Sequence, residues 1–63
     1  MESLFTYVRA AAAEVGADFS VGRMRQDRHG PYRIFTIYGR NPWQGILCHD
    51  GKCWYYTGDC WPL

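Results

Sequence analysis

The sequence lacks any long apolar run. No apolar stretch exceeds four residues, and the stretch 10–13 consists of alanine alone. A secretory signal needs an apolar segment of about 7–15 residues, and a membrane helix needs about 20. Met1 is followed by the acidic Glu2 and not by a cluster of basic residues. We therefore expect a cytoplasmic protein with no export signal and no association with a membrane.

The chain is also short, at 63 residues, and its formal net charge of +1 is close to zero. A chain of this length buries only about 60% of the surface that its unfolded form exposes. This length excludes two-domain enzymes and doubly wound nucleotide-binding folds, and it argues against a pocket of several hundred Å³. The aromatic fraction of 17% in turn excludes a disordered tail. We expect one domain, residues 1–63, without a cofactor.

The N-terminal residues 3–15 have the pattern of the one helix. Apolar side chains recur there with a 3.6-residue period, at Leu4, Phe5, Val8, Ala11, Ala12 and Val15. Ser3 is the expected N-cap, because its hydroxyl can accept a hydrogen bond from a free amide of the first turn. Gly16 follows at the position where a helix often ends in a left-handed residue.

After the helix the sequence has the pattern of β-strands. The predicted strands are 19–26, 32–38, 44–49 and 52–57, with turns at 27–31 and 39–42. Both faces of 32–38 are largely apolar, so this strand is expected to be central. The tail 58–63 has no periodicity, although Trp61 and Leu63 could cover a sheet edge or the core. The predicted fold is α+β: one N-terminal helix packed on a three- to four-stranded antiparallel meander.

The pair Asp50-Gly51 predicts a two-residue β-hairpin, because both central residues of a type I′ turn need a positive φ. This register places His49 opposite Lys52 and Cys48 opposite Cys53. It would allow a Cys48–Cys53 disulfide in an oxidising setting. In the cytoplasm thiols stay reduced, and we interpret the cysteines first as small apolar side chains that fill the hairpin.

The cysteines suggest two kinds of chemistry. The spacing of Cys48, Cys53 and Cys60 is C-x4-C-x6-C, whereas structural zinc sites usually use paired cysteines two to four residues apart. A Cys–His nucleophile would need an imidazole beside the thiol and a third group to orient it. His49 follows Cys48 directly in a strand, so their side chains point to opposite faces. We therefore expect neither a metal nor an enzyme.

The basic residues gather in the middle of the chain. Residues 23–40 contain five arginines against the one acidic residue Asp27, which gives +4, whereas 1–22 and 41–63 carry −2 and −1. Arg23 and Arg25 would share a strand face near Tyr32 and Tyr38, as in proteins that bind single-stranded nucleic acid. The interpretation that we favour is that these arginines are solvated and that their stems cover aromatic rings.

Eleven aromatic rings are too many for so small a core, so some are expected at the surface. In the segment 53–56, Trp54 and Tyr56 should share one face and Tyr55 the other. Exposed tryptophan, tyrosine and arginine are enriched at protein–protein hot spots. The candidate partner-binding residues are Arg23, Arg25, Arg28, Tyr32, Arg33, Tyr38, Arg40, Trp43 and Trp54.

A small chain with a capped helix at Ser3–Val15, a strand meander and no catalytic set resembles the stand-alone inhibitors encoded by phages and mobile elements, of which the anti-CRISPR proteins are the best-known group. The resemblance implies a binding protein in the cytoplasm of a bacterial host cell. Its partner would be a larger protein or nucleoprotein complex, with nucleic acid as the alternative. A minimal Cys/His metal or thiol protein is the second alternative. An edge strand and spare aromatic rings allow either a monomer or a homodimer.

Overall fold

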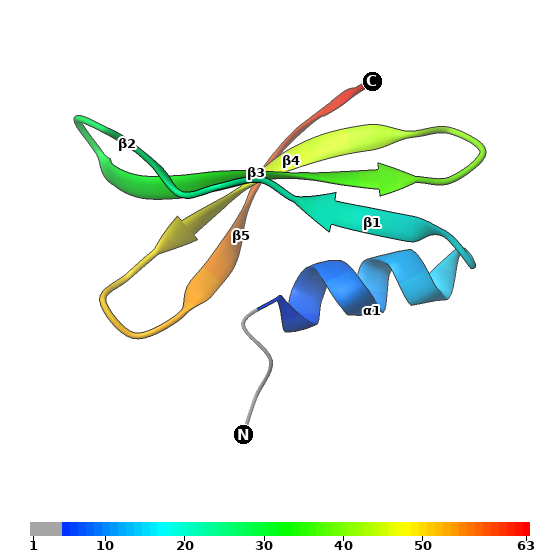
Figure 1. Ribbon diagram of the computed structural model, residues 1–63, viewed down its shortest axis with the longest axis horizontal. Helices are drawn as coiled ribbons and strands as arrows, with labels where there is room; N and C mark the ends of the chain where they lie inside the picture. Colours follow the sequence, from blue (N-terminus) through cyan, green and yellow to red (C-terminus); the bar gives the residue numbers. More distant parts are fainter. Residues whose placement is uncertain (1–4) are drawn as a thin grey trace.

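The computed structural model describes residues 5–63 and packs one helix against one face of an antiparallel sheet (Figure 1). This arrangement confirms the predicted α+β fold, with five strands in place of three or four. Along the chain the elements are α1 (Thr6–Glu14), β1 (Asp18–Val21), β2 (Arg25–Asp27), β3 (Gly30–Tyr38), β4 (Trp43–His49) and β5 (Trp54–Pro62).

The helix is shorter than the predicted range 3–15, and it ends as the sequence indicates. Gly16 adopts a φ of 62°, which glycine reaches without steric cost. The N–H of Ala17 donates to the carbonyl oxygen of Ala12 at 2.9 Å, and this bond satisfies a carbonyl group of the last helical turn. Gly16 is therefore confirmed as the helix stop. The predicted cap, Ser3, lies outside the described residues.

Strand β3 is central, as predicted: β4 pairs along one side, and β1 and β2 pair along the other. The prediction of one continuous strand over 19–26 was wrong, because it is interrupted at residues 22–24. The Gly22 N–H still donates to Ile34 across the sheet at 2.8 Å. The Gly22 carbonyl, however, accepts a hydrogen bond from the Arg33 guanidinium at 2.9 Å. A side-chain partner for this carbonyl accompanies the break between β1 and β2.

The loop between β4 and β5 differs from the predicted two-residue turn. Cross-strand pairs of β4 with β5 are His49 with Trp54 and Cys48 with Tyr55. The loop therefore spans four residues, and the three cysteines of the chain are free thiols. The predicted pairing of Cys48 with Cys53 was wrong, so the register gives no support to a disulfide between them.

The cause of the longer loop is the side chain of Asp50. Its carboxylate accepts hydrogen bonds from the backbone N–H groups of Lys52 at 2.8 Å and Cys53 at 2.9 Å. Of the residues in this loop only Gly51 has a positive φ, at 98°, whereas a type I′ turn needs two. The carboxylate thus organises a wider turn than the Asp-Gly pair suggests.

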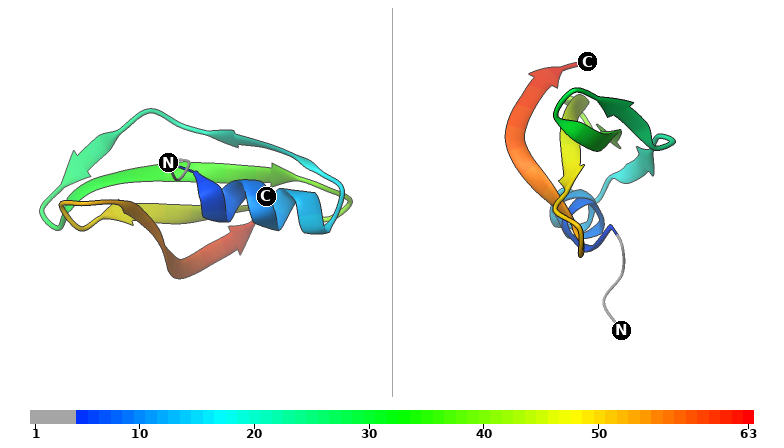
Figure 2. Two further views of the ribbon diagram at one scale, coloured as in Figure 1. Left: turned by 90° about the horizontal axis from the view of Figure 1, so that it is seen from below. Right: turned by 90° about the vertical axis from the view of Figure 1, so that its left-hand side faces the viewer.

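The C-terminal tail 58–63, which has no periodicity in the sequence, continues strand β5 as far as Pro62. Strand β5 bends in its middle (Figure 2), where Gly58 has a φ of 93° and the pairing with β4 shifts. The Thr57 hydroxyl donates to the Ile46 carbonyl at 3.1 Å and accepts from the Asp59 N–H at 3.1 Å. At the bulge these bonds replace the regular backbone hydrogen bonds between β4 and β5. The bulge also interrupts the two-residue period that would mark a strand in the sequence.

The core lies between α1 and the sheet. It consists of Val8, Ala12, Phe35, Ile37 and Leu47. The edges of Phe35 meet the rings of Tyr7, Trp43 and Tyr56 with centroid distances of 6.4, 5.3 and 5.6 Å. Below the Phe35 ring lies Gly45, where a Cβ atom would stand 2.6 Å from Phe35 Cζ. The missing side chain at this position is what makes room for the Phe35 ring.

Replacing Gly45 by alanine should destabilise the fold, because the new methyl group would overlap the buried Phe35 ring. We expect the free energy of unfolding in urea to fall by about 1–3 kcal/mol. Gly39→Ala is the matched control, since a Cβ atom there would meet only Ala17 and Val15 side chains, at 3.5 and 3.9 Å. Equal stability of the two variants would contradict this packing.

The β4–β5 loop should respond to acid. Donation from Cys53 and Lys52 holds the pKa of Asp50 below its usual 3.8. The loop stabilisation is therefore complete above pH 3.8 and lost as the pH falls through the lower folded value. NMR titration should show the two loop amides shifting with a midpoint below 3.8, and Asp50→Asn should abolish that titration. A midpoint at or above 3.8 would overturn the assignment.

Candidate functional site

The two faces of the sheet are unequally covered. Helix α1 packs on the face that carries Phe35, Ile37 and Leu47, called here the helix face (Figures 1 and 2). No other helix or strand formed by residues 5–63 covers the opposite face, called here the open face. The alternation of β3 and β4 places the following residues on the open face: Tyr32, Ile34, Thr36, Tyr38, Gln44, Ile46 and Cys48.

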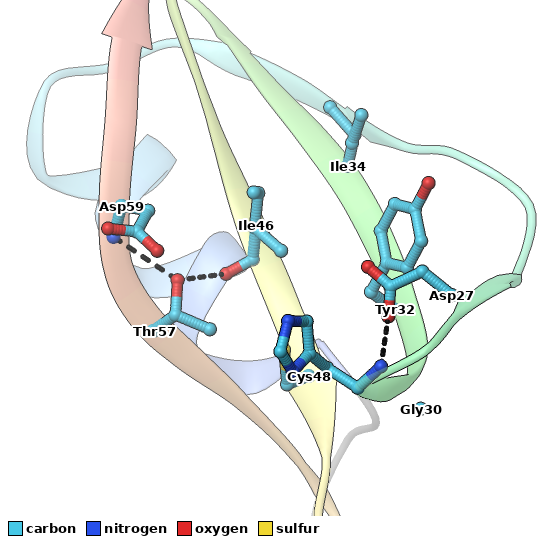
Figure 3. Close-up of a pocket in the computed structure, with 9 residues that line it drawn as sticks. Asp27, Gly30, Tyr32, Ile34, Ile46, Cys48, Thr57 and Asp59 are labelled. Carbon is cyan, nitrogen blue, oxygen red and sulfur yellow. Dashed lines mark hydrogen bonds between the residues drawn. The ribbon is translucent and has the colours of Figure 1, made fainter.

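A groove of about 580 Å³ crosses the open face (Figure 3). Strands β3 and β4 supply its floor, with Tyr32, Ile34, Ile46 and Cys48. The walls are the β2–β3 turn, with Asp27 and His29, and the bulge of β5, with Thr57 and Asp59. The sequence length argued against a large cofactor pocket of such a volume, and the groove differs from one in being open to the surface. The curvature of one bent sheet creates an open groove without any enlargement of the core.

The centre of the floor is apolar and held in place. Ile34 and Ile46 lie directly opposite each other in the antiparallel register of β3 and β4. Both side chains are half-buried, so they still present apolar surface to the groove. Because β3 and β4 are the inner strands of the sheet, their backbones are paired on both sides. The floor is therefore a rigid apolar surface.

The walls carry two carboxyl groups on opposite sides of this floor (Figure 3). One oxygen of Asp27 accepts the backbone N–H of His29 at 2.8 Å, and its other oxygen has no partner among residues 5–63. In the same range no hydrogen bond or ion pair reaches the carboxylate of Asp59. No arginine or lysine of the described chain lines the groove. The groove thus combines an apolar floor with two carboxylates that form no ion pair within residues 5–63, and Arg25, directly opposite Tyr32, lies beside it on the open face.

One end of the open face is closed by a chain of hydrogen bonds. The Trp61 indole N–H donates to Gln44 Oε1 at 2.9 Å, and Gln44 Nε2 donates to the Thr36 hydroxyl at 3.1 Å. This chain leaves Thr36 only 7% exposed although it lies on the uncovered side of the sheet. Trp61 therefore covers part of the open face, and the groove begins beyond it. The sequence suggested instead that Trp61 and Leu63 cover a sheet edge or the core, and Leu63 is 64% exposed.

Three of the predicted partner-binding residues belong to the packing of the helix face. Trp43 and Trp54 pack against the core cluster. The guanidinium of Arg33 lies over the rings of Phe5 and Trp54, at 5.6 and 5.0 Å from their centroids. It also donates to the carbonyl of Gly22 at 2.9 Å. These side chains stabilise the fold. The favoured interpretation expected solvated arginines whose stems cover aromatic rings, whereas in Arg33 the guanidinium itself lies over the rings.

The other predicted residues are spread over the two ends of the sheet. Arg23, Arg25 and Arg28 are exposed in or beside β2, and Arg40 is exposed in the turn between β3 and β4. Arg23 lies in the break after β1, so it does not share a strand face with Arg25. Tyr32 lines the groove, and Tyr38 lies 52% exposed near the far end of β3, its hydroxyl bonded to Ser20 at 2.9 Å. Of the predicted set, Arg25 and Tyr32 are brought together as directly opposed residues of β2 and β3 on the open face, whereas Tyr38 and Arg40 lie at the other end of β3.

The thiols and imidazoles are distributed over both faces. Cys48 lines the groove, whereas the next residue, His49, points to the helix face, where its ring meets Trp54 at 5.0 Å. Among residues 5–63 no group of three or more histidine, cysteine or acidic side chains is placed to hold a metal ion. On the helix face a hydrogen bond with Cys60, together with burial, raises the pKa of Tyr56 to about 12. This phenol therefore stays protonated at neutral pH.

Sequence reasoning missed most of the groove. It placed Asp27 in a turn and Asp59 in a tail without periodicity, and it placed Ile34 and Ile46 in strands without a surface role. One signal was present: both faces of 32–38 are apolar, and a single helix can cover only one of them. The apolar side chains of the second face had to remain open or bind something else.

Comparison of the chain with protein-family models, with curated proteins and with solved structures finds no match. The helix of the described region, at nine residues, is not long and apolar enough to cross a membrane.

The structural role of Arg33 can be tested by Arg33→Lys. An ammonium group lacks the planar guanidinium that spans Phe5, Trp54 and the Gly22 carbonyl, and we expect a loss of about 1–2 kcal/mol in the free energy of unfolding. The matched control is Arg23→Lys, at an exposed position, with a change within about 0.5 kcal/mol. Urea denaturation of both variants measures these changes. An Arg33→Lys variant as stable as the control would contradict the assignment.

Proposed function

We propose that the chain is a non-enzymatic binding protein that holds a segment of a larger protein in the open groove. By binding that segment the chain would mask a functional surface of the partner or of a nucleoprotein complex. An inhibitor of the anti-CRISPR type would act in this way. The observation that carries this proposal is the uncovered groove of about 580 Å³ on a rigid apolar floor.

The floor supports binding because it needs no rearrangement. Ile34 and Ile46 already present their side chains on paired inner strands. Binding would therefore cost little free energy for ordering the groove. Burying apolar surface stabilises a complex by about 25 cal/mol per Å² before such costs. Tyr55, which is 46% exposed and lies opposite Cys48, adds an aromatic ring beside this floor. Aromatic anchors at the centre of an interface supply much of its affinity.

Catalysis is less well supported by the same groove. Cys48, His29 and Asp27 all line it, which is the residue set of a thiol nucleophile with its base. Asp27, however, accepts the backbone N–H of His29 and not its imidazole. No hydrogen bond within residues 5–63 joins the Cys48 thiol to His29. The groups that would have to act together are not linked.

Nucleic acid is also a poorer fit to the groove. Arg23, Arg25 and Arg28 are exposed near one end, yet none of them lines the groove. The ionisable wall groups that face the floor include the carboxylates of Asp27 and Asp59, which repel phosphate. A protein segment therefore suits the site better than a nucleic-acid backbone.

The proposal predicts that a charge on the floor abolishes partner binding. Ile46→Lys should reduce capture of the partner from the native host cell at least about tenfold, because it places an ammonium group on the apolar floor. Ala13→Lys, at an exposed position of α1, adds the same charge on the other side of the molecule and should leave capture unchanged. Quantitative mass spectrometry of the captured proteins measures both.

Two further measurements make this test decisive. Tyr55→Ala removes an exposed ring without touching the core cluster, so it should weaken capture even where Ile46→Lys perturbs the fold. Retention of single-stranded oligonucleotide at low salt, lost steeply as salt rises, would support the nucleic-acid alternative instead. Capture that survives both groove substitutions would refute the proposed function.

A further inference from the structure

We propose that the side chain seated in the groove is an arginine, carried on an exposed segment of the partner and flanked by residues without positive charge. This inference rests on the proposed function and specifies what the partner must present. It follows from how the charged and apolar parts of the groove are arranged.

The two carboxylates face a shared space from opposite walls. Asp59 stands on the bulge of β5, and Asp27 stands at the end of β2 (Figure 3). Asp59 keeps both oxygens available, and Asp27 keeps one, because the other accepts the His29 amide. A cation between the walls would satisfy oxygens that no residue of the described chain engages. Asp27 stands on β2 and Asp59 on β5, with β3 and β4 between them, so a guanidinium on the floor would bind the carboxylate of one wall at a time, through its fork of N–H donors.

The floor suits the rest of an arginine side chain. Its three-carbon stem is apolar and packs on aliphatic surface such as Ile34 and Ile46. The Tyr32 ring borders the same floor and offers an aromatic face to a cation (Figure 3). The ammonium group of lysine is compact. It can neither stack on a ring as a plane nor form a bidentate pair with a carboxylate, so arginine fits the groove better than lysine.

The surroundings of the groove select against a run of basic residues. Arg25 lies on the open face directly opposite Tyr32, and Arg28 lies in the β2–β3 turn, although neither lines the groove itself. Their charges would repel further cations on an incoming segment, and they favour neutral or acidic neighbours. The arrangement therefore favours a segment with one arginine inside the groove over a polybasic segment.

The test uses the whole protein and synthetic peptides as probes. A capped pentapeptide, acetyl-Gly-Leu-Arg-Leu-Gly-amide, is titrated into the 15N-labelled protein and followed by two-dimensional NMR. We expect the amide resonances of Tyr32, Ile34, Ile46 and Asp59 to shift. The same peptide with citrulline in place of arginine keeps the shape without the charge, and it should bind about tenfold more weakly or worse.

Substitutions locate the charge effect. The double variant Asp27→Asn with Asp59→Asn removes both carboxylates, and the new amide at Asp27 can still accept the His29 N–H. It should bind the arginine and citrulline peptides equally. Asp18→Asn removes one charge from the open face outside the groove and should leave the preference for arginine intact.

The outcomes separate this inference from the proposed function. Equal binding of the two peptides by the unmodified protein, or no shift of groove resonances at millimolar peptide, would overturn the arginine assignment. If the partner is captured by the double variant but lost with Ile46→Lys, the binding function stands and the arginine inference is wrong. If the partner is captured by all the groove variants, the proposed function fails first.

Discussion

The ring of Phe35 determines where the other large side chains of this molecule can lie. It is fully buried, it needs the missing side chain of Gly45, and three aromatic residues contact its edges. Val8 and Ala12 of α1 close the same cluster. With one short helix, the chain gathers its core on a single face of the sheet. The second face receives no covering element from the described residues, although it also carries apolar side chains.

The groove is a consequence of this one-sided core. Ile34 stays half-buried because the helix is committed to the Phe35 side, and the bulge around Gly58 turns β5 so that Asp59 becomes a wall. The acidic walls and the apolar floor therefore come from different causes: the floor from strand alternation, the walls from a turn and a bulge. Their combination is the basis of the proposed site for a cationic side chain with an apolar stem.

The sequence predicted the parts of the fold that depend on local patterns. Periodicity gave the helix, Gly16 gave its end, and the two apolar faces of 32–38 gave the central strand. The prediction failed where one side chain forms hydrogen bonds with backbone groups elsewhere in the chain. Asp50 does so in the β4–β5 loop, and Arg33 does so at Gly22. The sequence did not predict the site for a related reason: Asp59 lines the groove only because strand β5 bends.

The central claim is that the partner contacts the open face and not the helix face. The chain contains three isoleucines: Ile34 and Ile46 on the groove floor, and Ile37 buried on the helix face. A protein labelled only at the isoleucine δ1-methyl groups therefore carries two probes and one internal control. On addition of the purified partner, the Ile34 and Ile46 methyl resonances should shift or broaden while Ile37 stays unchanged. A shift confined to Ile37, or no shift in a formed complex, would contradict the claim.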